Sequence, residues 1–200
     1  MMMKNFGTQV EVAWESMRPI TKELIVGILK PGKRRKTKKN SSHDAHSDWE
    51  ISRLLDALDE QAVATKDART DDDLDEINNL ANICAGVLEE KTVSAEIFIQ
   101  LAKRALARND YSKIDSLADA LHERFSVTEI AEVIRQSDVP QIRAICYETL
   151  AVMPALSVAP LVNDPLYFEI GCNVLEQQLI EFDNLEAGRI LEQMAPRFNF

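Results

Sequence analysis

The chain has 200 residues, of which 46% are hydrophobic, 6% aromatic and 28% charged, and its formal net charge is −10. This hydrophobic content is enough to bury a core, and the scarcity of glycine, proline and aromatic residues favours helices over a many-stranded β fold. No run of 18 apolar residues occurs, which argues against a transmembrane helix, and the first residues do not resemble a secretory signal. We therefore expect a cytoplasmic protein, with a peripheral place at the cytoplasmic membrane face as the alternative.

Charge is distributed unevenly along the chain. Residues 1–40 carry ten Lys and Arg against three Asp and Glu, whereas residues 41–200 carry thirteen against thirty. Most of the positive charge lies in residues 30–39, which read K-P-G-K-R-R-K-T-K-K. Such opposite charges predict that the two parts bind different partners.

Residues 8–29 have apolar side chains at helical spacing, interrupted by Pro19. The proline either kinks one helix or starts a second at its first turn. Pro31 and Gly32 end this helical stretch, and residues 30–47 are too polar to fold alone. The sequence thus predicts an amphipathic and polybasic docking arm over residues 1–46, and deletion of residues 1–40 is expected to leave the helical remainder folded. The residues expected to contact a partner or a membrane are Trp14, Met17, Leu24, Ile28, Lys30, Lys33, Arg34, Arg35, Lys36, Lys38 and Lys39.

Residues 47–200 are predicted to form a helical-repeat domain. Ser47 and Glu50 have the spacing of a capping box and should start its first helix, and Ser126 and Glu129 should start a later one. The first helix continues with an apolar face around Leu54 and Leu58. Further apolar stripes and caps predict helices over about 71–88, 95–108, 114–121, 126–134, 138–150, 164–175 and 183–194. The short connections indicate antiparallel helix pairs.

Two stretches near the end of the chain resemble each other. Asp138-Val139-Pro140 leads to Leu150, Asp164-Pro165 leads to Leu175, and pairing Pro140 with Pro165 gives a period of 25 residues. This rhythm is typical of solenoids. Over residues 126–195 the chain resembles the HEAT-like superfamily, in particular the leucine-rich-repeat variant, at Asp138, Ile142-Arg143, Pro154, Leu161 and Asp164. The second copy departs from the pattern, with Phe168-Glu169 in place of an apolar-Arg pair.

The resemblance implies an all-α fold of stacked antiparallel helix pairs, an α-solenoid that serves as a platform for protein–protein interaction. Some proteins of this variant carry an iron–sulfur cluster in a cysteine-rich extension. This chain has only Cys84, Cys146 and Cys172, without a C-x-x-C pair. We therefore expect reduced, buried thiols and no cofactor.

Residue patterns typical of catalysis are missing from the sequence. It contains no G-x-S-x-G, no phosphate loop and no dinucleotide-binding glycine pattern. His43, Asp44, His46 and Asp48 lack a further fixed ligand and are interpreted as a polar surface cluster rather than a metal site. The sequence thus predicts a protein that is not an enzyme, with no metal and no small-molecule substrate.

Three functional hypotheses remain. The first is a scaffold or accessory subunit whose arm docks into a larger assembly, while its acidic helical face binds a basic partner. The second is a peripheral membrane adaptor that uses the amphipathic and basic signals together on an anionic membrane surface. The third is a nucleic-acid-associated protein, which is disfavoured because no aromatic residue interleaves the basic run and the acidic remainder repels phosphate.

Overall fold

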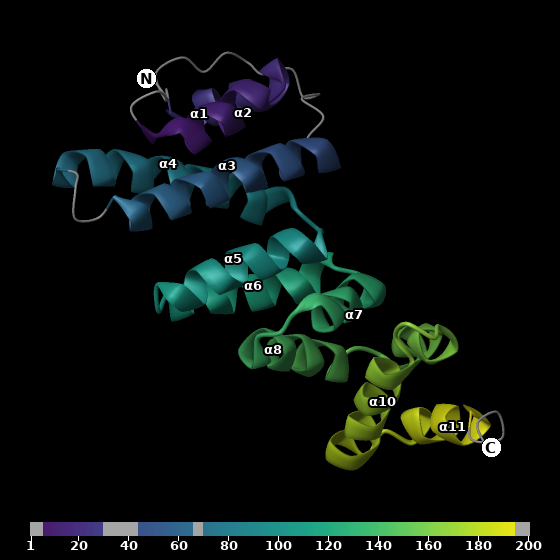
Figure 1. The fold of residues 1–200 in the computed structure, drawn as a ribbon. Helices are drawn as coiled ribbons and strands as arrows, with labels where there is room; N and C mark the ends of the chain where they lie inside the picture. Colours follow the sequence, from purple (N-terminus) through teal and green to yellow (C-terminus); the bar gives the residue numbers. More distant parts are fainter. Residues whose placement is uncertain (1–5, 30–43, 66–69, 195–200) are drawn as a thin grey trace. The chain divides into compact units, whose positions relative to one another are not determined.

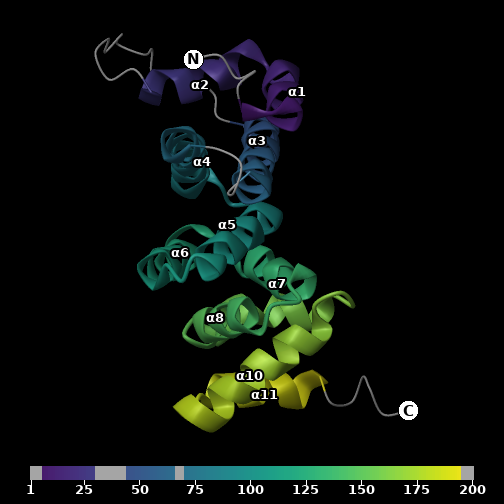
Figure 2. The same cartoon turned by 60° about the vertical axis from the view of Figure 1, so that its left-hand side comes forward.

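The computed structural model describes residues 6–29, 44–65 and 70–194, and all regular structure in these ranges is helical, with no strand. The predicted all-α class is confirmed (Figures 1 and 2). The chain divides into two compact units, one ending at Thr92 and one beginning at Val93. This boundary places residues 6–29 in the same unit as the helices that follow them.

The described residues of the first unit form four helices, namely α1 (Thr8–Ser16), α2 (Pro19–Leu29), α3 (Ala45–Ala64) and α4 (Asp71–Lys91). Helices α3 and α4 form a pair, α1 packs on α3, and α2 contacts both α3 and α4 (Figure 1). Pro19 is the first residue of α2, so it starts a second helix. The buried side chains of this unit include Phe6, Val10, Ala13, Met17, Ile25, Ile51, Leu54, Leu55, Leu58, Ile77, Leu80, Cys84 and Leu88.

The start of α3 differs from the sequence-based expectation. The capping residue is Asp44, whose carboxylate accepts a hydrogen bond from the backbone N–H of Ser47, and the helix begins at Ala45. The predicted capping box of Ser47 and Glu50 is wrong, because Ser47 and Glu50 are the third and sixth residues of the helix and both side chains are buried. Asp44 lies three residues before Ser47 and caps the helix, and Glu50 instead accepts hydrogen bonds from Arg18, between α1 and α2, and from Thr21 of α2.

The second unit begins with α5 (Ala95–Ala107), α6 (Tyr111–Arg124), α7 (Val127–Gln136) and α8 (Pro140–Ala151). The short helix α9 (Ala155–Val158), the 3-10 helix η2 (Ala159–Asn163), α10 (Phe168–Phe182) and α11 (Leu185–Met194) follow. The capping box of Ser126 and Glu129 is confirmed at the start of α7, and Pro140 occupies the first turn of α8. Contacts join α5 to α6 and α7, α7 to α8, and α10 to α8 and α11.

Helix α10 starts three residues later than Pro165, the predicted start. Asp164 instead forms a turn, in which its carboxylate accepts from the N–H of Leu166 and its carbonyl accepts from the N–H of Tyr167. The turn brings α10 close to η2, where Gly171 faces Leu161 and Val162. Farther along α10, the buried amide of Gln178 donates to the carbonyls of Leu150 and Met153 at the end of α8, at 3.3 and 2.8 Å.

Candidate functional site

Helix α2 has an apolar flank that the described residues of the first unit leave partly exposed. Six of its eleven residues are Ile, Leu or Val, yet only Thr21 and Ile25 are buried. Ile20 and Ile28 are 40% and 52% exposed, and Leu24 between them is half-buried. Residues four apart lie on one side of a helix, so these three form a continuous row. We call Ile20, Leu24 and Ile28 the α2 flank.

The predicted docking residues have different surroundings. Met17 is buried in the core of the first unit, whereas Trp14 is partly exposed, with the ammonium group of Lys22 5.7 Å from its ring centre. Leu24 and Ile28 belong to the α2 flank. Ile20 completes that flank and was not singled out from the sequence. Lys30, Lys33, Arg34, Arg35, Lys36, Lys38 and Lys39 lie outside the described residues.

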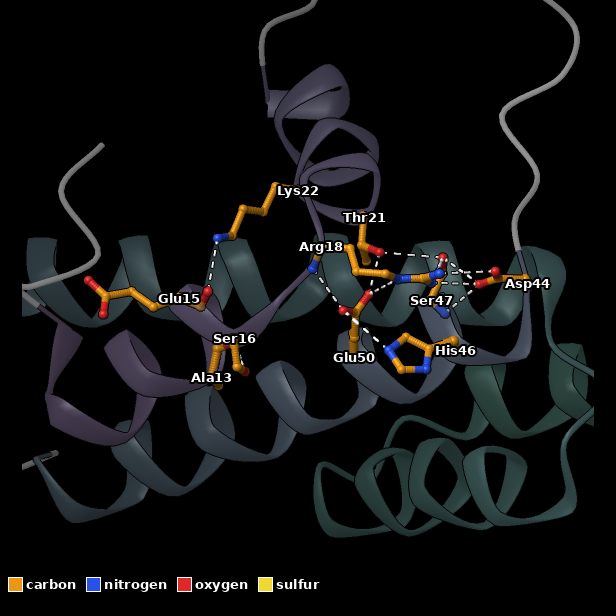
Figure 3. Close-up of polar contacts among 10 residues, drawn as sticks. All are labelled: Ala13, Glu15, Ser16, Arg18, Thr21, Lys22, Asp44, His46, Ser47 and Glu50. Carbon is orange, nitrogen blue, oxygen red and sulfur yellow. Dashed lines mark hydrogen bonds and ion pairs between the residues drawn. The ribbon is translucent and has the colours of Figure 1, made fainter.

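A polar cluster, buried at Thr21, Ser47 and Glu50 and partly exposed at Arg18 and Asp44, joins the start of α2 to α3 (Figure 3). One carboxylate oxygen of Glu50 accepts from the backbone N–H of Arg18 at 2.7 Å, and the other accepts from Nε of Arg18 at 3.2 Å and from the hydroxyl of Thr21. The Arg18 guanidinium also donates to the carboxylate of Asp44 at 2.7 and 3.1 Å and to Oγ of Ser47 at 2.9 Å. We call Arg18, Thr21, Asp44, Ser47 and Glu50 the Arg18 clasp.

The electrostatics of the Arg18 clasp favour its charged forms. The hydrogen bond between Arg18 and Asp44 is the main reason why the pKa of Arg18 is raised, and the same bond lowers the pKa of Asp44 below its usual range. Burial alone would raise the pKa of Glu50, but the hydrogen bonds from Thr21 and Arg18 outweigh burial and lower it. The clasp therefore holds a charged guanidinium between two carboxylates and fixes the α1–α2 junction on α3.

The packing of α1 and α2 changes one expectation. Phe6, Val10, Ala13, Met17 and Ile25 are all less than 7% exposed. Their removal would uncover the apolar faces of α3 and α4, so truncation of residues 1–40 should destabilise the first unit rather than leave it intact. Point substitutions on the surface of α2 are the cleaner means of testing its role.

Other reactive groups in the described ranges are dispersed. No group of three or more His, Cys, Asp or Glu side chains is placed to hold a metal ion in those ranges. Cys84 and Cys146 are buried and Cys172 is half-buried, these three cysteines form no disulfide, and burial raises the pKa of Cys146 to about 12. A thiol with such a pKa is a poor nucleophile at neutral pH. Among the described helices, none is both long enough and apolar enough to cross a membrane.

No protein-family model matches the chain, and comparisons with curated proteins and with solved structures likewise gave no match.

Proposed function

We propose that this protein is a non-catalytic helical scaffold or accessory subunit that docks into a larger assembly through its N-terminal residues. The docking surface consists of the α2 flank together with the basic residues 30–39 that follow α2 in the sequence. The helices of the second unit form a repeat-like α-solenoid, whose exposed surfaces serve as a binding platform.

The α2 flank is the observation that carries this proposal. A helix with six large aliphatic residues that buries only one of them, Ile25, has apolar surface available for a partner. Exposed apolar surface next to polar residues is a common feature of interaction sites. Seven basic residues follow α2 within ten positions, so the complementary surface should be apolar at its centre and acidic at its edge.

The contacts within the second unit support the solenoid part of the proposal. Helix α5 contacts both α6 and α7, α7 contacts α8, and α8 also contacts α6 and α10. In solenoid proteins, nearest-neighbour stacking of this kind leaves exposed faces free for binding. The residues of the two matching stretches, Pro140 and Pro165, lie at or just before the starts of α8 and α10.

A double substitution, Ile20→Asp with Ile28→Asp, tests the docking surface. Both side chains are exposed, so the fold should persist while an apolar contact with a partner is lost. We expect affinity purification from the native source to recover a partner with the wild-type chain and to lose it with the double variant. Val63→Asp is the matched control, since Val63 is 79% exposed on α3 and lies outside the flank. Equal recovery with the wild type and the double variant would overturn the proposal.

An anionic membrane is the second candidate partner, because apolar side chains next to a basic run are also the two signals of peripheral membrane binding. Vesicles with and without anionic lipid distinguish the two candidates. Sedimentation of the wild-type chain with anionic vesicles, lost in the double variant, would support the membrane. Recovery of a protein partner without vesicle binding would support the assembly.

A further inference from the structure

A groove runs between α1 and α3 in the first unit and shares no residue with the α2 flank. Its volume is about 410 Å³, and it is open to solvent. The residues that line it are Thr8, Gln9, Val12 and Ala13 from α1, and Arg53, Asp56, Ala57 and Glu60 from α3. The volume is of the size that binds ligands or partner side chains.

The hollow arises from small side chains at the contact of the two helices. Ala13 and Ala57 are buried and form the floor, because neither is large enough to fill the space above it. Next to Thr8 and Glu60, Gly7 and Gln61 pack so closely that a Cβ atom on Gly7 would lie 2.3 Å from Oε1 of Gln61. Gly7 has a φ of +117°, which strongly favours glycine, so this packing depends on the sequence found here.

Side chains typical of protein interfaces surround the floor. Val12 is 57% exposed at the rim, and Trp49, one turn before Arg53 on α3, is 50% exposed. The Arg53 guanidinium lies 4.9 Å from the centre of the Trp49 ring. Exposed tryptophan and arginine beside an apolar surface are the residues that most often dominate binding energy.

The charge of the rim indicates which occupant fits. Asp56 and Glu60 are exposed carboxylates on the α3 side, and Arg53, the single cation among the described residues that line the groove, rests on Trp49. An anionic rim attracts basic side chains and repels acidic peptides, phosphates and anionic lipids. The groove is open rather than enclosed and is lined by two helices, so it suits a segment that lies along them better than an enclosed small molecule.

We infer that this groove binds one amphipathic helix of a partner protein, whose apolar ridge lies on Val12, Ala13 and Ala57 and whose Lys or Arg residues lie beside Asp56 and Glu60. Helix-in-groove recognition uses apolar anchors at i, i+3, i+4 and i+7. The contact involves about two turns of each helix, which is below the size of stable interfaces, so the complex should be transient.

Two synthetic 14-residue helical peptides test the inference on the full-length protein. They share a ridge of leucines and differ only in the flanking residues, which are lysine in one and glutamate in the other. By calorimetry, we expect saturable one-to-one binding of the lysine peptide and at least tenfold weaker binding of the glutamate peptide. Val12→Asp and Glu60→Lys should each weaken the binding of the lysine peptide at least tenfold.

The Val12→Asp variant separates the groove from non-specific charge attraction. It adds a negative charge, so a purely electrostatic association with the lysine peptide would strengthen, whereas groove binding would weaken. Matched controls are Val63→Asp and Glu76→Lys, which lie outside the groove and should bind like the wild type. Circular dichroism confirms that each variant remains helical. Absent binding of the lysine peptide, equal binding of both peptides, or an equal loss in the control variants would overturn the inference.

Discussion

The carboxylate of Glu50 is 4% exposed and accepts hydrogen bonds from the backbone and guanidinium of Arg18 and from the hydroxyl of Thr21. Arg18 lies between α1 and α2 and Thr21 lies in the first turn of α2, so one side chain of α3 holds the start of α2 in place. A buried carboxylate is costly unless its oxygens are hydrogen-bonded, and here both are.

Glu50→Gln should destabilise the first unit. The amide places an NH₂ group where one oxygen now accepts, leaving a donor of Arg18 or Thr21 without an acceptor, at a cost of about 1–3 kcal/mol. Trp14 and Trp49 are the only tryptophans in the chain and both belong to this unit, so their fluorescence during urea unfolding reports its free energy of unfolding. Glu60→Gln, on the exposed face of α3, is the control and should change little. An unchanged stability of Glu50→Gln would show that the Arg18 clasp is not structural.

In the second unit, we expect the hydrogen bonds of the Glu132 carboxylate to be sensitive to acid. Hydrogen bonds from Arg135, Gln136 and Tyr167 hold its pKa at about 2, with Arg135 the largest cause. The unfolded value is about 4.3. A carboxyl group whose pKa is lower in the folded state stabilises the fold at any pH above its unfolded pKa. The stabilisation from Glu132 is therefore lost as the pH falls from about 4.3 toward 2. NMR titration should show the low pKa of the Glu132 carboxyl in the wild type. In Arg135→Met this pKa should rise toward its unfolded value, whereas in the control Lys103→Met it should not change. A pKa already at the unfolded value in the wild type would contradict this.

Residues far apart in the sequence explain why the Arg18 clasp was not predicted. The spacing of Ser47 and Glu50 fits a capping box, and nothing in their neighbourhood shows that Arg18 binds Glu50 instead. One signal was available in α2. Thr21 lies on the same face as Ile25 and both are buried, so its hydroxyl needed an acceptor from another helix.

At the scale of elements, helix positions followed from apolar periodicity and from the local caps. Ser126 with Glu129 and Pro140 are local signals, and both mark helix starts in the structure. The start of α10 was misplaced by three residues because Asp164 and Pro165 form a turn that only the packing of η2 on α10 reveals. Local sequence signals thus predict the existence of a helix well, but they predict its first residue poorly where tertiary contacts determine that residue.

Substitution by alanine should have opposite effects on the free energy of unfolding at two helical glycines. A Cβ at Gly171 of α10 would lie 2.8 Å from Cγ1 and 3.0 Å from the backbone nitrogen of Val162, whereas one at Gly86 of α4 would meet nothing within 4 Å. Gly171→Ala should lower the free energy of unfolding by about 1–2 kcal/mol, because η2 and α10 must separate. Gly86→Ala should raise it by about 0.5–1 kcal/mol through helix propensity. Chemical denaturation followed by circular dichroism compares them, and stabilisation by both would contradict the close packing at Gly171.

At the scale of the molecule, the all-α class followed from composition, but the assignment of the first helices to a unit did not. The sequence pattern of residues 8–29 is amphipathic whether its apolar side packs internally or on a partner. The structure shows that both occur, since Met17 and Ile25 are buried while Ile20 and Ile28 are exposed. Amphipathicity indicates that a face will be covered, and burial is needed to decide which residues remain for docking.

The α2 flank is the central element of the proposed function, and crosslinking from it is the most direct test. A variant of the full-length chain with a photoreactive amino acid at position 28 is expressed in the native source. A separate control variant carries the same amino acid at position 63. The account predicts a specific crosslinked product from position 28 that is absent from position 63 and is lost when Ile20→Asp is added. No product from position 28, or the same product from both positions, would contradict it.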